Sequence, residues 1–302
     1  MSMCQLYGGI EAGGTKFVCA VGTGPDDLKD EVRFPTTTPE ETIGKAVEYF
    51  QRYSGELAKV GIAAFGPLCL DMNAPEYGHI TSTPKPGWQN TDIRGMVHRA
   101  LGIPVAIDTD VNGAALAEHL WGAGRGVDNL VYLTVGTGIG GGGLVNGQLI
   151  HGLVHPEMGH IRVPHNTMWD SFEGCCPYHG DCLEGLASGK AVELRWGEPG
   201  ENLPSDHPAW ELEAEYLGYG LNNIICTLSP ERILIGGGIL KTPDLIESIR
   251  DMVGALLEGY IDAPSITQDI ERYIVLPGLG DRAGVLGAIA LAKSFDAPSK
   301  KE

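Results

Sequence analysis

A glycine-rich turn between two apolar runs, near the start of the chain, constrains the fold most strongly. Leu6–Ile10 is predicted as a strand, Glu11–Lys16 as a turn and Phe17–Val21 as the returning strand of a hairpin. Glycine lets backbone N–H groups approach an anion closely, and a hydroxyl and an ammonium in the same turn can join them. The turn is a candidate phosphate site, although a plain hairpin turn would have the same pattern. Its candidate phosphate-binding residues are Gly13, Gly14, Thr15 and Lys16.

A second glycine-rich turn follows the apolar strand predicted at Asn129–Val135. The residues after it, GTGIGGGG, contain G-x-G-x-x-G, which also occurs in dinucleotide-binding folds. There the motif opens a helix, whereas here Gly143-Leu144-Val145 reads as a strand that turns at Asn146-Gly147, a strong hairpin signal. The segment therefore predicts a second hairpin. Thr137 and Gly138 at its tip suit a second set of phosphate oxygens, so the two tips could hold one polyphosphate between them.

Glycines also follow the strand predicted at Arg232–Ile235. Gly236-Gly237-Gly238 does not begin a Walker loop, because Leu240 occupies the position of the second motif glycine. Backbone without side chains can instead approach a flat nucleoside, so we expect these glycines, and Gly189, to contact a nucleotide. The chain contains 44 glycines, more than the usual share, which agrees with several close approaches between backbone and ligand.

Four potential metal ligands gather in one segment in the middle of the chain. Cys176, His179 and Cys182 form C-x2-H-x2-C, and His160 lies a short loop upstream. Two thiolates and two imidazoles suit a tetrahedral zinc ion. Adjacent cysteines rarely reach one ion, so Cys175 is the spare thiol. The alternatives are ordinary buried thiols with surface histidines, and a zinc ion that only stabilises the fold.

Three carboxylates, in different parts of the sequence, are candidates for catalysis or substrate binding. Asp110 follows the strand predicted at Val105–Asp108, and in open α/β sheets ligands bind at the carboxyl ends of strands. Asp110 is therefore a candidate general base, but it could equally cap the helix predicted from residue 113 to about residue 121. Glu157 and Glu184 flank the metal segment, so folding of that segment would bring both carboxylates towards one cleft.

The loop Thr81–Trp88 contains two prolines and a glycine, which indicates an ordered loop rather than a linker. Trp88 is expected either to stack on a ligand or to close a core. Lys85 in the same loop is a further candidate for substrate binding. Elsewhere, strands are predicted at Lys59–Phe65 and Tyr273–Leu276, and helices at Pro39–Arg52, Trp210–Leu228, Pro243–Leu257 and from Asp281 to about Ala292.

Charge and composition narrow the class of protein. The net charge of -18 argues against nucleic acid or an anionic membrane as a partner, because both attract basic proteins. No stretch has the length of an apolar membrane span, and the first residues lack the basic and apolar regions of a signal peptide. Seven cysteines, an odd number, with a metal-like cluster indicate a reducing cytoplasm. A length of 302 residues suits two α/β lobes better than one domain.

The two glycine-rich hairpins, the DTDVN segment and the GGG turn occur in the order expected of the actin-like, ribonuclease-H-like sugar-kinase fold, in which two α/β lobes close over ATP. With the metal segment added, the chain resembles the ROK family of bacterial sugar kinases over nearly its full length. GIEAGGTKF, TPKPGW, TDVNGAALAE, HPEMGH and CPYHGDC are most similar to the bacterial fructokinase branch of that family. The resemblance implies an N-terminal lobe of residues 1–116 with about 283–302, and a C-terminal lobe of residues 117–282.

The resemblance also implies a role for each candidate residue. Asp110 would take the proton from a sugar hydroxyl as general base, while other polar side chains hold the remaining hydroxyls. These are Asn112, Glu157, His160 and Glu184. His160 would bind zinc through one ring nitrogen and face the sugar with the other. Mg2+ is expected with ATP, and Glu11 is a candidate for holding it through water.

The activity implied by the resemblance is phosphorylation of D-fructose to D-fructose 6-phosphate by ATP, in a cytoplasmic homodimer. Mannokinase, a broad-specificity hexokinase or glucokinase, and a non-catalytic sugar sensor are the alternatives. Thr109 stands where glucose-specific members carry Asn, which disfavours glucose. A sugar-responsive repressor would need DNA-binding helices before the first hairpin, and only a few residues precede Leu6.

Overall fold

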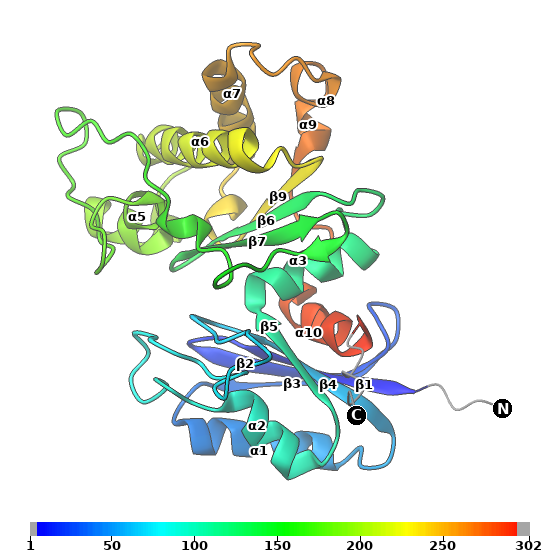
Figure 1. The fold of residues 1–302 in the computed structure, drawn as a ribbon. Coiled ribbons are helices and arrows are strands. Elements are labelled where there is room, and N and C mark those ends of the chain that lie inside the picture. The colour runs from blue at the N-terminus through cyan, green and yellow to red at the C-terminus, as the bar shows by residue number, and fades with distance from the viewer. Residues whose placement is uncertain (1–4, 295–302) are drawn as a thin grey trace. The chain divides into compact units, whose positions relative to one another are not determined.

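The computed structural model describes residues 5–294, which form two compact α/β units. Residues 5–126, 149–156 and 278–294 form one of them, called unit 1, and residues 127–148 and 157–277 form unit 2. Each unit contains a five-stranded mixed sheet with helices packed on it (Figure 1). The α/β class expected from the sequence is confirmed. The lobe boundaries near residues 116 and 283 stay a prediction.

The sheet of unit 1 has the strand order β3-β2-β1-β4-β5. Its strands are β1 (Leu6–Ala12), β2 (Lys16–Gly22), β3 (Leu28–Pro35), β4 (Leu57–Ala64) and β5 (Val105–Thr109). The strands β1, β2 and β3 pair antiparallel, whereas β4 and β5 run parallel to β1. The first predicted hairpin is thus confirmed as β1 and β2. The edge strand β3 was not predicted, because its sequence LKDEVRFP is polar and its residues are half-buried or exposed.

Helices cover both faces of this sheet. They are α1 (Pro39–Gln51), α2 (Ile93–Leu101), α3 (Asp110–Trp121) and α10 (Ala283–Ser294), the last preceded by the turn η4 (Gly280–Arg282). The helices α1 and α2 lie on one face, and α3 and α10 lie on the other (Figure 1). On the second face, a Cβ at Gly61 in β4 would collide with the carbonyl oxygen of Ala288, so the close packing of α10 on the sheet requires glycine there.

The helix α1 shows why the predicted elements form. Thr38 caps it by accepting a hydrogen bond from the backbone N–H of Glu41, and Pro39 follows in the first turn. Ile43, Ala46, Val47 and Phe50 recur at helical spacing, and all four are buried against the sheet.

The sheet of unit 2 has the strand order β10-β9-β6-β7-β8. Its strands are β6 (Leu130–Val135), β7 (Ile139–Val145), β8 (Gln148–Leu149), β9 (Arg232–Gly236) and β10 (Ile274–Val275). β6 and β7 pair antiparallel, so the second glycine-rich segment is a hairpin, as predicted, and not the start of a helix. At its far end Asn146 and Gly147 have φ of 52° and 70°, the left-handed conformation that a tight hairpin turn needs.

The helices of unit 2 include the two long predicted ones and several short ones. They are η1 (Met158–His160), α4 (Leu183–Ala187), α5 (Gly189–Trp196), η2 (Gly200–Asn202), α6 (Ala209–Leu228), η3 (Ile239–Lys241), α7 (Leu245–Leu257), α8 (Pro264–Thr267) and α9 (Ile270–Tyr273). The short helices α4 and α5 follow the metal segment directly and position its end.

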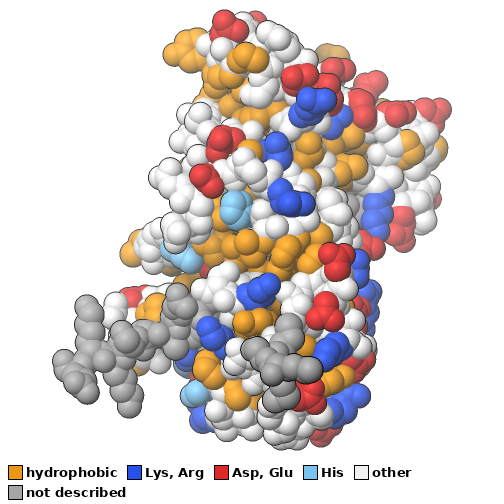
Figure 2. Space-filling model, turned by 90° about the vertical axis from the view of Figure 1, so that its right-hand side faces the viewer, with side chains coloured by type: hydrophobic (Ala, Val, Ile, Leu, Met, Phe, Trp, Pro, Cys, Tyr) orange, Lys and Arg blue, Asp and Glu red, His pale blue; other side chains and the backbone are white. Residues whose placement is uncertain are grey.

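Within residues 5–294, no helix combines the length and the apolar character needed to cross a membrane. On the face drawn in Figure 2, Lys and Arg side chains lie among Asp and Glu side chains instead of forming a separate basic patch.

Candidate functional site

Four side chains of unit 2 form a cluster that can hold one metal ion. The ligand atoms of His160, Cys176, His179 and Cys182 all lie within 4.8 Å of one another. Nδ1 of His160 lies 3.6 Å from the sulfur of Cys176 and 3.6 Å from that of Cys182, and Nδ1 of His179 lies 3.6 Å from the sulfur of Cys176. Around a tetrahedral zinc ion, with bonds of about 2.3 Å to sulfur and about 2.1 Å to nitrogen, such atoms would be about 3.6 Å apart. The donor set therefore fits zinc.

Backbone hydrogen bonds shape the knuckle, residues 176–182. Cys176 and Gly180 exchange two backbone hydrogen bonds of 2.9 and 3.1 Å, and Gly180 has a φ of 67°. Cys182 is the residue before α4. Burial, above all, raises the pKa of the Cys182 thiol to about 11, and the neighbouring Cys176 adds to this. A cation is thus needed to hold the sulfur of Cys182 as a thiolate at neutral pH. Cys175 lies outside the ligand set, as expected, with its sulfur 4.0 Å from the hydroxyl oxygen of Ser188.

The carboxylates flanking the metal segment both belong to unit 2. Glu184 lies in α4, and its Oε2 accepts a 2.9 Å hydrogen bond from the backbone N–H of Ile139 at the tip of the β6–β7 hairpin. A Cβ at Gly138 would lie 2.6 Å from the same oxygen, so a larger residue there would displace the Glu184 carboxylate. Glu157 is exposed and precedes η1, whose last residue is His160. The segment from Glu157 to Glu184 thus contains both carboxylates and the metal cluster, and Glu184 connects it to the tip of the second hairpin.

The tip of the first hairpin is held open by its own backbone. The N–H of Gly13 donates to the carbonyl of Lys16 at 3.0 Å, and the hydroxyl of Thr36 donates to the carbonyl of Gly13 at 2.7 Å. No atom lies within 4 Å of a Cβ placed on Gly14, and Thr15 and Lys16 are exposed. Gly14, Thr15 and Lys16 are thus open to an anion, whereas the N–H of Gly13 is used within the turn.

Glu11 lies at the base of that tip. Burial raises the pKa of its carboxyl, Lys16 lowers it, and the nearby charge of Asp110 raises it again. The carboxyl packs on the start of α10, where a Cβ at Gly284 would lie 2.5 Å from its carbon. A cation beside Glu11 would offset the repulsion from Asp110, which is what holding Mg2+ through water at Glu11 would require.

Asp110 is the first residue of α3, which begins earlier than predicted. The cap is Thr109, whose hydroxyl accepts a 3.1 Å hydrogen bond from the backbone N–H of Asn112. The Oδ1 atom of Asp110 accepts a 2.9 Å bond from the N–H of Val111. Because Thr109 caps the helix, the capping role considered for Asp110 is filled by its neighbour.

Asn112 is more deeply placed than expected for a sugar ligand. Its side chain is fully buried, and its Nδ2 donates to Oδ1 of Asp108 at 2.9 Å and to the carbonyl of Ile150 at 3.5 Å. Oδ2 of Asp108 lies 2.7 Å from Nε2 of His151. No motif identified Asp108 or His151, because their relation appears only when β5 and the segment Leu149–Pro156 come together.

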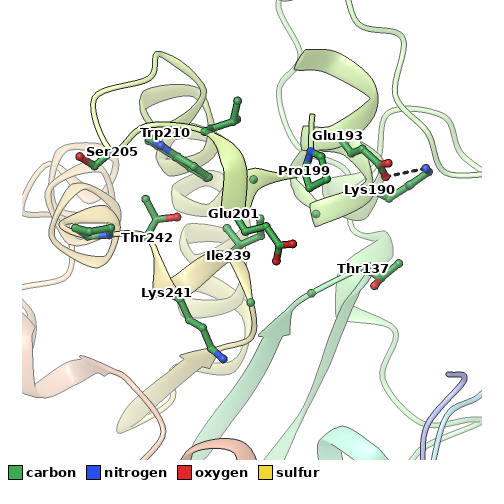
Figure 3. A pocket seen from close by; sticks show the side chains of 16 residues that line it. Thr137, Lys190, Glu193, Pro199, Glu201, Ser205, Trp210, Ile239, Lys241 and Thr242 are labelled. Atoms are coloured by element: carbon green, nitrogen blue, oxygen red, sulfur yellow. Dashed lines mark hydrogen bonds and ion pairs between the residues drawn. The ribbon is translucent and has the colours of Figure 1, made fainter. Parts of the chain in front are cut away.

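Unit 2 also contains a pocket of about 680 Å³ beside the second hairpin (Figure 3). Thr137, Gly189 and Gly238, three of the predicted nucleotide contacts, line it. The N–H of Gly189 donates to the carbonyl of Gly136 at 2.7 Å, which joins the start of α5 to the hairpin tip. Gly138, Gly236 and Gly237 do not line the pocket. Gly237, with φ of 103°, passes so close to Val135 that only glycine fits, so its role there is backbone geometry.

Sequence reasoning missed the side chains that give the pocket its chemistry. Trp210 and Ile239 supply apolar surface, Lys190 and Lys241 supply ammonium groups, and Glu201 projects into the space between them (Figure 3). Lys190 pairs with Glu193 at 2.9 Å. A flat apolar wall with cations near a glycine-rich tip can bind a nucleoside and its phosphates. Lys241 is the third residue after the GGG turn, and this position was the one sign in the sequence that it could reach a nucleotide.

The two candidate substrate contacts in the loop before α2 differ in their exposure to solvent. Trp88 is fully buried, with its ring centroid 5.5 Å from that of Phe17 and 5.6 Å from that of Phe65. Its Nε1 donates to the carbonyl of Thr37 at 2.8 Å. The ring therefore closes the core, the second of the two roles expected for Trp88, and has no exposed face on which a substrate could stack. Lys85 is half-buried and remains a candidate.

Comparison with known proteins places the chain in a family. The model of the ROK family matches residues 7–295. The chain belongs to the ROK family. Among ROK relatives, a fructokinase of Zymomonas mobilis is 50% identical over 295 residues, 95% of this chain and 96% of that protein. A putative fructokinase of Bacillus subtilis is 45% identical over 287 residues, 95% of each chain.

A solved ROK hexokinase from Thermus thermophilus is 28% identical, covers 96% of this chain and 98% of its own, and has a TM-score of 0.77. ROK sugar kinases have the two-lobed actin-like fold, so the fold expected from the sequence is confirmed. Five relatives described as fructokinases or putative fructokinases are 39% to 50% identical to this chain, whereas three glucokinases are 28% identical.

Proposed function

We propose that this chain is an ATP-dependent fructokinase that converts D-fructose to D-fructose 6-phosphate. The observation that carries the proposal is the identity of 39% to 50% with five relatives described as fructokinases or putative fructokinases, over at least 95% of this chain. The glucokinases, at 28%, are more distant, which ranks glucose behind fructose as the substrate.

Asp110 is the proposed general base. Its carboxylate accepts the proton of the fructose 6-hydroxyl while that oxygen bonds to the γ-phosphorus of ATP and the bond to the leaving ADP oxygen breaks. Phosphoryl transfer asks little covalent chemistry of a protein and depends on an aligned hydroxyl, a placed base and charge compensation. The hydrogen bond from Val111 N–H to one oxygen fixes the orientation of the Asp110 carboxylate.

The remaining fructose hydroxyls need donors and acceptors that fix the sugar. We assign this role to five side chains: Asn112, Glu157, His160, Glu184 and Lys85. Glu184 also holds the tip of the second hairpin through Ile139, so a sugar bound there would be coupled to the phosphate end of the nucleotide.

The pocket beside the second hairpin is the proposed adenosine site. Trp210 and Ile239 offer apolar surface to the base, and Thr137 and Lys190 lie where phosphates would follow. The first hairpin tip, Gly13–Lys16, supplies backbone N–H groups and an ammonium to the same phosphates. Mg2+ bound with ATP would neutralise phosphate charge, with Glu11 as its proposed holder through water.

Zinc is the proposed structural ion of the cluster His160, Cys176, His179 and Cys182. Nδ1 of His160 faces the sulfurs, so the other ring nitrogen is left for the sugar, and the ion orients a substrate ligand. We further propose that the protein acts in the cytoplasm, because a kinase of free sugars needs access to ATP. The family resemblance is the basis for proposing a homodimer.

Purified protein with ATP, Mg2+ and a panel of fructose, mannose and glucose tests the function. We expect the highest kcat/KM with fructose. Turnover of mannose or glucose in preference to fructose would refute the substrate, and no turnover of any hexose would refute the enzyme class.

A further inference from the structure

His151 has no role in the mechanism above, yet its imidazole reaches the strand that ends at the proposed base. Its Nε2 lies 2.7 Å from Oδ2 of Asp108, a carboxylate whose side chain is 4% exposed. The hydrogen bond to Asp108 raises the pKa of His151, burial lowers it, and the charge of Asp108 raises it further. The two side chains therefore form a charge-assisted pair, in which the carboxylate is buried and the imidazole is partly open to solvent.

The other oxygen of Asp108 reaches residues on both sides of Asp110. Its Oδ1 accepts the backbone N–H of Thr109 at 2.7 Å and the side-chain Nδ2 of Asn112 at 2.9 Å. Thr109 in turn caps α3 by accepting the N–H of Asn112. One carboxylate thus fixes the first turn of α3, and any rotation of that carboxylate would move the backbone that carries Asp110.

His151 also belongs to a segment that contacts the rest of unit 1 and then leads into the proposed sugar ligands. Leu149–Pro156 is held on unit 1 at three points: the carbonyl of Ile150 accepts from Asn112, His151 meets Asp108, and Nε2 of His155 accepts the backbone N–H of Leu68 at 3.0 Å. The chain then continues directly into Glu157 and His160, two of the proposed sugar ligands. The pair therefore acts on the base and on the start of the sugar-binding segment.

We propose that His151 is a positioning residue for phosphoryl transfer, because it fixes the Asp108 carboxylate that sets the first turn of α3 and holds the segment leading to Glu157. The inference rests on the proposed function. In this role His151 acts through Asp108 and not on the reacting atoms, and it limits where Asp110 can lie.

The first test is His151→Gln in the full-length protein, assayed with fructose and ATP. We expect kcat to fall roughly tenfold to a hundredfold, because a small displacement of a base is costly to transfer. The KM for ATP should stay unchanged, since the adenosine pocket is lined by unit 2 alone. His98→Gln is the matched control: His98 is an exposed histidine of α2 in unit 1 whose Nδ1 lies 2.8 Å from a backbone carbonyl oxygen, and its replacement should leave kcat unchanged.

A double-mutant cycle with Asp108→Asn separates this role from general loosening of the fold. If His151 acts through Asp108, the double variant should lose no more kcat than the more affected single variant. Additive losses, or a kcat for His151→Gln equal to that of His98→Gln, would overturn the proposal.

An NMR titration of the His151 imidazole needs no activity. We expect its pKa above the ordinary 6.5 in the wild type and a lower pKa in Asp108→Asn. Equal values in the two proteins would show that the pair is absent and overturn the inference. A wild type without fructose turnover would instead refute the proposed function, and the titration would still decide whether the pair exists.

Discussion

Asp110 is the residue on which the proposed chemistry depends. Asp110→Asn keeps the size of the side chain and an oxygen able to accept from Val111 N–H, but it removes the basic oxygen. We expect kcat for fructose to fall by about 10²-fold to 10⁴-fold, the usual contribution of a general base, with an unchanged Tm. A coupled assay for ADP and a thermal melt measure both. A variant with nearly full kcat would remove Asp110 from the role of base.

Glu213 in α6 is a buried carboxyl outside the site. It is 1% exposed, and neither of its oxygens has a hydrogen-bond partner in the structure. Burial raises its pKa well above 4.5, and Arg195 only partly offsets this. Above pH 4.5 the unfolded chain loses this proton while the folded chain keeps it, so the folded state becomes relatively less stable as pH rises towards the folded pKa.

Glu213→Gln should remove that pH dependence. We expect the free energy of unfolding of the variant minus that of the wild type to be larger at pH 8 than at pH 4, by at least about 1 kcal/mol, since one pKa unit corresponds to about 1.4 kcal/mol. Denaturant unfolding at both pH values measures this. Glu211→Gln, at an exposed position of the same helix, is the control and should show no such difference; an equal response of both variants would contradict the account.

Single residues were predictable where their spacing in the sequence carries the chemistry. The candidate metal ligands Cys176, His179 and Cys182 repeat at intervals that one turn can bring together, and the structure does so. The pair of His151 with Asp108 spans 43 positions and two elements, so no local pattern contains it. Trp88 lies in a loop rich in proline and glycine, which suggested exposure, but tertiary packing against Phe17 and Phe65 buries it.

At the scale of elements, the hairpins and long helices were predictable because their apolar periodicity is strong and their turns have specific glycines. The helix α2 was missed because it is short and contains Gly95, which makes room for the Asp92 cap: a Cβ at Gly95 would collide with that carboxylate. The pocket residues Lys190 and Trp210 lie on different helices, so their meeting depends on tertiary packing.

The knuckle is the element whose stability should depend on an ion. Metal analysis should find about one zinc per chain in the wild type and in Cys175→Ser, and much less in Cys182→Ser, because Cys175 lies outside the ligand set. Removing the zinc with a chelator should lower Tm by about 5 °C or more and open the segment 165–182 to proteolysis. A wild type without zinc, or equal zinc loss in both cysteine variants, would contradict this assignment.

For the whole molecule, the order of the motifs along the chain predicted the fold class, because the same order is expected of the actin-like sugar-kinase fold. The membership in the ROK family and the α/β sheets agree with that prediction. The sequence could not reveal the return of Leu149–Pro156 to unit 1, since nothing in its composition distinguishes it from the strand and loop around it.

The central claim, transfer of the γ-phosphoryl group of ATP to the 6-hydroxyl of fructose, is tested most directly by ³¹P NMR of one reaction containing the protein, ATP, Mg2+ and D-fructose. The account predicts that the resonance of fructose 6-phosphate grows at the same rate as that of ADP. Fructose 1-phosphate as the product, or ADP formed with inorganic phosphate and no sugar phosphate, would contradict it.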